Sequence, residues 1–482
     1  MLKLFKPVFY VCGLLSLMMA AMLLLPTTLG WFHQDSETHA FLVSAGISFI
    51  AGVFLIAAFR PRKFSLGPRQ LYLLTCCSWA LLSVIGALPL IFGHDHIRFT
   101  DAVFESVSGI TTTGSTILTG LEYMPHSLLL WRALLQWIGG LGVIGMAVSI
   151  LPFLHVGGMR LFQTESSDWS DKSLPRLADL ARSLFLVYML ITTGCILGYW
   201  INGMNLFDAI SHALTTVSTG GFATDDRSMG RFGPAILWVS VLFMLLGALP
   251  FVMFIRLLTQ PSLKVFLDQQ VRGFLLIVAV LTLIMTLYLI GQDIYGPFEA
   301  LTQAAFNIVS VITTTGFAST DYTLWGGFSL AFFFFVTFIG GCSGSTSGGM
   351  KVFRFQLSFM FLIRQIKLLV HPRGIFSIRY NGKEVEDDII FSAVAFSFLF
   401  FMVLVFTTMV LALTGLDFVT SITGAATALT NVGPGLGDII GPAGNFAPLS
   451  DTAKWVLSFA MLLGRLELLS IMVLFSGVFW RG

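Results

Sequence analysis

The chain has 482 residues, of which 56% are hydrophobic and only 11% charged, which excludes an array of soluble domains and predicts a protein that crosses a membrane several times. The formal net charge of +2 and the scattered basic residues argue against nucleic acid as a partner. The five cysteines are an odd number and lie in or beside apolar runs, which excludes a disulfide framework or a zinc site.

Apolar stretches long enough for transmembrane helices follow one another along the chain. The first, residues 8–31, is long and lacks a small-residue cleavage site, so we expect a retained helix rather than a signal peptide. The others lie near residues 38–59, 70–93, 127–153, 180–202, 233–258, 273–292, 326–370, 389–415 and 452–480. The sequence therefore predicts an all-α polytopic membrane protein with ten transmembrane helices.

The charged residues set the expected orientation. Most lysines and arginines fall on one side if the amino terminus is cytoplasmic, and this bias predicts that both termini are cytoplasmic. The internal basic segments, above all 160–182 and 351–383, could simply be anchors that contact lipid headgroups. Acidic residues prefer the outer side, where they would attract cations, although each one alone is more simply a solvated loop residue or a helix cap.

Four short segments, each centred on one glycine, align with one another along the chain. They are Thr111-Thr112-Thr113-Gly114, Ser218-Thr219-Gly220-Gly221, Thr313-Thr314-Thr315-Gly316 and Thr430-Asn431-Val432-Gly433. Each follows an acidic residue and a stretch too short to cross a membrane, and each precedes a full-length apolar helix that carries a further glycine. Those acids are Asp101, Asp208, Glu299 and Asp417, and the later glycines are Gly139, Gly247, Gly340 and Gly464. The repeated unit is a helix, a half-helix, a glycine segment and a helix.

Such a unit suits an ion pore. Irregular backbone at membrane depth is tolerated only where protein shields it or where it lines a water-filled cavity, so we expect the four segments to surround one interior space. Glycine lets carbonyl oxygens turn toward the axis, where they can replace a cation's hydration shell, and the carboxyl ends of the half-helices favour a cation there. One such segment alone could be a loop or a helix-packing site, but four in register predict a filter.

A gate is predicted below this filter. The stretch Gly340-Gly341-Cys342-Ser343-Gly344-Ser345-Thr346-Ser347-Gly348-Gly349 cannot continue a helix, because each glycine costs about 1 kcal/mol relative to alanine. We expect a loop on the cytoplasmic side, placed to block ions and followed by Lys351. Arg465 stands at the corresponding position of the fourth repeat, and a buried cation needs a partner. We expect oxygens of residues 341–347 in that role; an acid such as Glu467 is the alternative.

On these residues the chain resembles the Trk/Ktr/HKT superfamily of potassium transporters, specifically its TrkH-type members, over essentially its whole length. The resemblance implies a single-chain pseudo-tetramer around one pore. The implied parts are two additional helices in residues 1–66 and repeats in 67–160, 161–265, 266–380 (with the gating loop 340–349) and 381–482. It implies that Gly114, Gly221, Gly316 and Gly433 are the filter glycines and that Arg465 belongs to the gate. A glycine in the first repeat implies a preference for potassium, and the fourth segment departs most from the pattern.

The resemblance also has implications for cargo and partners. Potassium would be the only ion at the filter, with no organic cofactor, and the protein would take up potassium across the bacterial inner membrane. A cytoplasmic, nucleotide-binding TrkA-type subunit would regulate it, and two copies of the chain would form a homodimer in the membrane.

Two other functions remain open from the residues alone. Gly341-Cys342-Ser343-Gly344 fits the GxSG pattern of rhomboid intramembrane proteases, but the histidines that would activate Ser343 lie mostly at loops and span ends. A proton- or sodium-coupled potassium symporter usually carries acids or histidines in mid-membrane, and only Glu467, Asp388 and Asp179 approach that position. We therefore expect a channel-like pathway and no enzyme activity.

Overall fold

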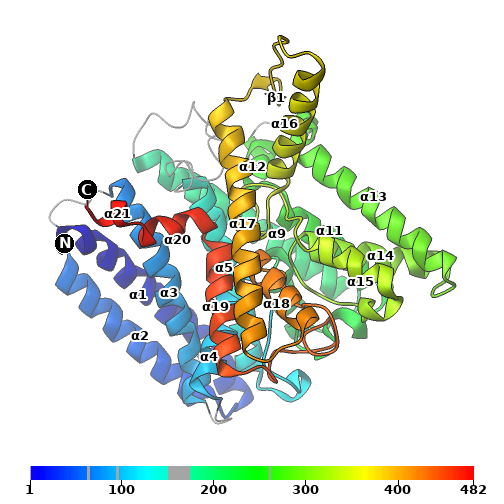
Figure 1. The fold of residues 1–482 in the computed structure, drawn as a ribbon. Coiled ribbons are helices and arrows are strands. Elements are labelled where there is room, and N and C mark those ends of the chain that lie inside the picture. Colours follow the sequence, from blue (N-terminus) through cyan, green and yellow to red (C-terminus); the bar gives the residue numbers. More distant parts are fainter. Residues whose placement is uncertain (1, 62–65, 94–96, 150–173, 260–261, 482) are drawn as a thin grey trace.

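The computed structural model describes residues 2–61, 66–93, 97–149, 174–259 and 262–481 and is helical almost throughout (Figure 1). The expected border between the first two repeats, at residues 160 and 161, and most of the basic segment 160–182 lie outside the described residues. A two-stranded antiparallel hairpin, β1 (Arg379–Tyr380) and β2 (Lys383–Glu384), is the sheet that the described residues contain. It lies beyond the end of α16 (Val352–Val370), at the top of Figure 1.

Two long helices at the amino terminus, α1 (Leu2–His33) and α2 (Thr38–Phe59), lie side by side at one edge of the molecule (Figure 1). Both pack against α3 (Pro68–Phe92), and α1 also packs against α5 (His126–Ser149). The outward faces of these two helices are apolar and exposed, as expected for helices that contact lipid. The bounds of α2 coincide with the expected stretch 38–59.

The remaining helices fall into four groups of the same order: a long helix, a short helix that ends at a glycine segment, and a helix that leads away. The first group is α3, α4 (Phe99–Ile110) and α5; the second is α9 (Leu174–Ile201), α10 (Leu206–Val217), α11 (Pro234–Ala248) and α12 (Phe251–Thr259). The third is α13 (Gln269–Gly291), α14 (Pro297–Ile312), α15 (Gly327–Val336) and α16, and the fourth is α17 (Asp387–Leu413), α18 (Phe418–Thr430), α19 (Asp451–Arg465), α20 (Leu468–Phe475) and α21 (Gly477–Arg481). Short 3₁₀ turns connect them at η1 (Leu121–Tyr123), η2 (Ser228–Arg231), η3 (Leu263–Leu267) and η4 (Tyr322–Trp325).

The four short helices, α4, α10, α14 and α18, are 12 to 16 residues long and are buried along most of their length. A helix of this length cannot cross a membrane. Asn205 caps α10 and Asp417 caps α18, each accepting a backbone amide of the first turn, while α14 begins with Pro297. Three of the expected acids, Asp101, Asp208 and Glu299, lie in first turns. These acids therefore sit where helix starts favour negative charge.

Contacts between the groups close a ring. The first group meets the second where α5 packs on α10, and the second meets the third where α11 packs on α14. The third group meets the fourth through α16 and α17, and α19 of the fourth packs back on α4 of the first. The short helices are therefore held at the centre and the long helices lie around them.

Two of the expected spans are bent, and one is interrupted. The stretch 233–258 turns by 90° between α11 and α12, where Pro250 cannot donate a helical hydrogen bond, and the stretch 452–480 turns by 110° between α19 and α20. As its glycines predict, the stretch 326–370 is non-helical between α15 and α16. By length and apolar composition, seven helices of the described part could cross a membrane, or up to nine if each bent pair is one span.

Candidate ion pathway

The four glycine segments meet one another in a closed ring. A Cβ atom built on Gly114, Gly221, Gly316 or Gly433 would lie 2.3, 1.9, 1.9 or 2.7 Å from the carbonyl oxygen of Gly220, Thr315, Val432 or Thr113, respectively. Each of these carbonyls belongs to the next segment in cyclic order, and the fourth segment returns to the first. A side chain at any of the four positions would collide with a neighbouring backbone, so the ring can close this tightly only around glycine.

The backbone conformation is the same in all four segments. The residue two before each glycine is left-handed, with φ of 52° at Thr112, 51° at Thr219, 57° at Thr314 and 56° at Asn431. The following amide then donates to the carbonyl five residues earlier, at distances of 2.8 to 3.1 Å, which ends each short helix in a Schellman-type turn. A β-branched threonine rarely adopts this conformation, so its surroundings must hold it there. The fourth segment, although its sequence departs most, has the same backbone.

Glycines on the helices that follow the glycine segments allow these helices to pack closely against the ends of the short helices. A Cβ at Gly139, Gly247 or Gly464 would lie 1.9, 2.9 or 2.1 Å from a carbonyl oxygen in the last turn of its own group's short helix. Gly340 differs, because its Cβ would instead meet the carbonyl of Gly348 within the loop, at 2.3 Å. Three of the four expected glycines therefore support the ends of the short helices, and the third group uses its loop.

A buried ion pair braces the first segment. Glu105 of α4 and Arg132 of α5 lie 2.8 Å apart, and their side chains are only 1% and 2% exposed. Glu105 also accepts the hydroxyl of Thr116 and the amide of Ile117, just after the glycine. Arg132 donates to the carbonyl of Ala223, two residues after the glycine of the second segment. This brace was not identified from the sequence, because charges near the ends of apolar stretches are usually solvated.

Acids that follow the second glycine segment are likewise engaged by protein groups. Asp226 accepts the amides of Gly120 and Leu121 at 2.7 and 3.1 Å. These bonds connect the chain that follows the second filter glycine with the chain that follows the first. Asp225 pairs with Arg227 and Arg231 at 3.2 and 3.1 Å. Burial would raise the pKa of Asp225, but hydrogen bonds from these two arginines outweigh it and lower that pKa below the ordinary value.

A hollow opens on the side of the ring where the chain leaves each glycine. Its walls include Gly114, Gly221 and Gly316, together with Pro434 beside the fourth glycine. Asp225 and Asp226 line the same hollow. The ring is therefore reachable from this side, and the wall of the hollow carries both these acids and Arg132.

The loop of residues 340–349 lies against the ends of three short helices, on the other side of the ring. Thr346 Oγ1 lies 3.0 Å from the carbonyl of Val217 and 2.9 Å from that of Gly247. Thr314 Oγ1 accepts the amide of Gly348 at 2.6 Å, and a Cβ at Gly348 would lie 2.4 Å from the carbonyl of Thr430. Eight of the ten loop residues 340–349 are buried, and the other two, Gly344 and Gly349, are half-buried.

The same loop fills the break between α11 and α12. The amide of Cys342 donates to the carbonyl of Ala248 at 2.9 Å, and the carbonyl of Gly344 accepts the amide of Phe251 at 2.9 Å. Ser343 donates its amide to Gln270 Oε1 at 2.7 Å. The bend at Pro250 frees backbone groups, and the loop satisfies them.

Arg465 reaches the loop from the end of α19. Its Nη1 donates to the carbonyl of Thr346 at 3.0 Å, one of the loop oxygens expected from the sequence. The side chain is 4% exposed, and within the part of the chain that the structure describes its Nε and Nη2 have no hydrogen-bond partner. Glu467 was the alternative partner, but it pairs with Arg354 at 2.6 Å. Glu467 has φ +58° and lies in the break between α19 and α20, not on a helix as the sequence suggested.

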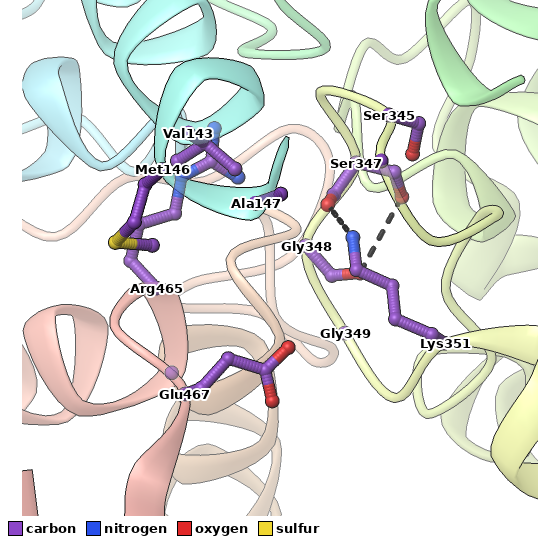
Figure 2. Close-up of a pocket in the computed structure, with 12 residues that line it drawn as sticks. Val143, Met146, Ala147, Ser345, Ser347, Gly348, Gly349, Lys351, Arg465 and Glu467 are labelled. Carbon is purple, nitrogen blue, oxygen red and sulfur yellow. Dashed lines mark hydrogen bonds between the residues drawn. The ribbon is translucent and has the colours of Figure 1, made fainter. Parts of the chain in front are cut away.

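Cations outnumber acids in this region. Figure 2 shows Lys351 and Arg465 approaching the loop from opposite sides of a small hollow, with Glu467 at its edge. Lys351 donates to the carbonyl of Ser347. Arg354 adds a third buried cation, which sequence reasoning missed although an arginine on an apolar helix was a signal. Asp179 and Asp388, which were considered as mid-membrane acids, are exposed near the starts of their helices.

Comparisons with known proteins give matches that cover most or all of the chain. The family model named TrkH, cation transport protein, matches residues 38–481. The Trk system potassium uptake protein TrkI of Halomonas elongata is 47% identical over 482 residues, which are 100% of this chain and 98% of that protein. The Trk system potassium uptake protein TrkH of Escherichia coli K12 is 36% identical over 483 residues, 99% of each chain. The crystal structure of the potassium transporter TrkH from Vibrio parahaemolyticus is similar with a TM-score of 0.92 and 34% identity, over 99% of this chain and 100% of that one.

Proposed function

This chain belongs to the TrkH family of cation transport proteins, and from that premise we propose that it takes up potassium through the ring of four glycine segments. It is a transporter and not an enzyme, so the protease reading of Ser343 is set aside. Potassium as the cargo is supported by the relatives, whose names describe potassium uptake. The observation that carries the pathway is the closed contact of Gly114, Gly221, Gly316 and Gly433 with one another's neighbouring carbonyls.

Four carbonyls in one ring suit an alkali cation. The carbonyls of Thr113, Gly220, Thr315 and Val432 stand at equivalent positions, and each can offer a lone pair to a dehydrated ion. The short helices end at the ring, so their partial negative charges add to the attraction. Asp226 in the outer hollow would raise the local concentration of cations before they enter.

The loop and Arg465 would form the gate. The loop is hydrogen-bonded at the ends of α10 and α14 and lies against the end of α18, so it would have to move for an ion to leave the ring toward the cytoplasm. Arg465 and Lys351 both donate to loop carbonyls, and their charges would oppose a cation at this level. Movement of the loop would release both obstacles together.

Topology and partners complete the proposal. The chain is a multi-pass protein of the inner membrane, and we propose that it has ten spans, cytoplasmic termini and repeats at 67–160, 161–265, 266–380 and 381–482. The relatives belong to a Trk system, which suggests a regulatory component. We propose a cytoplasmic TrkA-type subunit in that role, and a homodimer in the membrane. Coupled symport is not favoured, because the buried carboxylate of Glu467 is held by Arg354.

The test is ion flux in liposomes that contain the purified protein. We expect uptake of potassium or rubidium that exceeds sodium uptake and that increases when the cytoplasmic regulatory subunit is added. A matched sample with Gly316→Ser should lose this preference, because its Cβ would collide with Val432. Equal uptake of sodium and potassium by the unaltered protein would contradict the proposed filter. A reversal potential that follows an imposed pH gradient would instead favour symport.

A further inference from the structure

The second glycine segment lacks a side chain that the other segments have. At the position before the filter glycine, the other segments carry Thr113, Thr315 and Val432, whereas the second carries Gly220. In the first and third segments this threonine is held by its own short helix, because its Oγ1 lies 2.7 or 2.8 Å from the hydroxyl of the threonine two residues earlier. Gly220 has no side chain and cannot make this hydroxyl contact.

Gln136 occupies the vacant volume. A Cβ built on Gly220 would lie 2.4 Å from both Cδ and Oε1 of Gln136 and 2.9 Å from its Cβ. Gln136 belongs to α5 of the first group and is fully buried. A side chain at position 220 and the glutamine at 136 therefore exclude each other, and the chain has the glutamine.

The amide of Gln136 holds the second segment on both sides of its filter glycine. Its Nε2 donates to the carbonyl of Gly220 at 2.6 Å, and its Oε1 accepts the amide of Phe222 at 3.0 Å. Only this orientation of the amide satisfies both groups, because a carbonyl cannot donate and an amide N–H cannot accept. Gly221 lies between the two bonds, so the strand around it is fixed by a residue of the neighbouring group.

The carbonyl of Gly220 is one of the four equivalent ring oxygens. A carbonyl has two lone pairs, so this oxygen can accept the bond from Gln136 and still face an ion. Its position is then set by helix α5 as well as by the turn of its own segment, in which the amide of Gly220 donates to Thr215. A carbonyl that loses this bond could move inward toward a smaller ion, which would weaken discrimination between ions of different size.

We propose that Gln136 is a positioning residue that determines the ion selectivity of the filter by fixing the carbonyl of Gly220. This inference rests on the proposed potassium function. Gln136 touches the carbonyl and not the ion, so its effect should appear in the ratio of permeabilities more than in the amount of folded protein. Because Gln136 fills the volume that a side chain at position 220 would need, a substitution at one position can be compensated by a substitution at the other. The inference can therefore be tested with a double variant.

The experiment compares potassium, rubidium and sodium uptake in liposomes for three variants. Gln136→Met keeps the length of the side chain but removes both hydrogen bonds. We expect the potassium-to-sodium ratio to fall roughly three- to tenfold, the range that the one bond to the carbonyl of Gly220 is worth. Gly220→Thr alone should lose selectivity and much of its flux, because the new side chain collides with Gln136. The double variant Gln136→Gly/Gly220→Thr removes the whole glutamine side chain, including the Cβ that would lie 2.9 Å from the new one, and restores the residue type of the first and third segments. It should recover the ratio to within about twofold of the unaltered protein.

The control is Trp137→Phe, the next residue on the same helix, which removes the bond from the indole to Thr192 and part of a ring that packs on Tyr188 and Phe185, and which should leave the ratio unchanged. The inference is overturned if Gln136→Met retains the full ratio, or if the double variant is no better than Gly220→Thr alone. If Gln136→Met does not fold, the comparison of the double variant with Gly220→Thr still decides. Failure of the unaltered protein to prefer potassium would instead count against the proposed function itself.

Discussion

Arg354 and Glu467 form a buried ion pair of 2.6 Å that joins parts of the chain 113 residues apart. Arg354 lies in the first turn of α16, directly after the loop, and Glu467 lies in the break after α19. The guanidinium also stands 3.7 Å from the ring centre of Phe396 on α17. The pair therefore connects the exit of the loop with the helix that carries Arg465.

Removing one partner of this pair should destabilise the protein strongly. Arg354→Gln or Glu467→Gln leaves the other charge buried and unpaired, which typically costs about 3 to 5 kcal/mol. Thermal unfolding in detergent should show a lower midpoint for each variant and a smaller loss for the double variant. Asp387→Asn is the control, since its pair with Arg364 is exposed on the acid's side and should contribute little. A loss in the double variant equal to the sum of the two single losses would contradict a direct coupling.

Neutralising the arginine at the end of α19 should increase ion flux. Arg465→Ala removes a positive charge from the proposed pathway and its bond to Thr346, so the barrier to a cation should fall. Uptake of rubidium in liposomes measures the effect, and Arg465→Lys, which retains the charge, should stay closer to the unaltered protein. Flux that is unchanged or reduced in a well-folded Arg465→Ala sample would argue against an electrostatic gate.

Loosening the loop should make the pathway leak. Thr346→Val keeps the shape of the side chain but removes its hydrogen bonds to the carbonyls of Val217 and Gly247. We expect higher basal flux without the regulatory subunit, and a larger increase when part of residues 341–347 is deleted. Thr408→Val, on α17 and outside the loop, is the matched control, since the bond of its hydroxyl to Leu404 lies within its own helix. A pathway that remains tight after the deletion would show that the loop is not the obstacle.

Adding a side chain to the filter ring should weaken ion discrimination. Gly316 has φ +80°, and its Cβ would lie 1.9 Å from the carbonyl of Val432, so Gly316→Ser must displace the adjoining segment. We expect a lower potassium-to-sodium permeability ratio. Gly145→Ser provides the matched control on α5, where a Cβ would meet nothing within 4 Å. An intact ratio in Gly316→Ser would remove this glycine from the filter.

Asp225 should contribute pH-dependent stability. Its pKa is lowered in the folded protein, so its ionised form is stabilised relative to the unfolded chain. That contribution is fully present above the unfolded pKa of about 3.9 and is lost as the pH falls through the lower folded pKa. Asp225→Asn should therefore unfold at a lower temperature than the unaltered protein at pH 7, and the difference should shrink on acidification below about pH 4. A difference that grows as the pH falls would contradict this account.

Much of the fold could be predicted from hydropathy and from the four-fold repetition of one pattern. The apolar stretch 38–59 is α2, and the glycines of residues 340–349 do interrupt a helix. The breaks after Ala248 and Arg465 were missed because apolar composition continues across them, although Pro250 was a local signal for the first. That ions pass through the glycine ring stays a prediction.

The side chains behind the ring were harder to predict. Glu105 and Arg132 are 27 residues apart, and Gln136 and Gly220 are 84 apart, so their meeting depends on how the groups pack. Local pattern carries no information on such contacts. The absence of a threonine at position 220 was visible, but the residue that replaces it could be found only once α5 was placed beside the second segment.

The four segments of the ring are encoded separately. In a tetramer of identical chains, every substitution in the filter would appear four times at once, whereas here Asn431 and Gly220 each occur at a single corner while the backbone of all four corners stays the same. A single mutation in this chain therefore changes one segment of the ring and leaves the residues of the other three unchanged. The ion selectivity of such a ring can evolve one segment at a time.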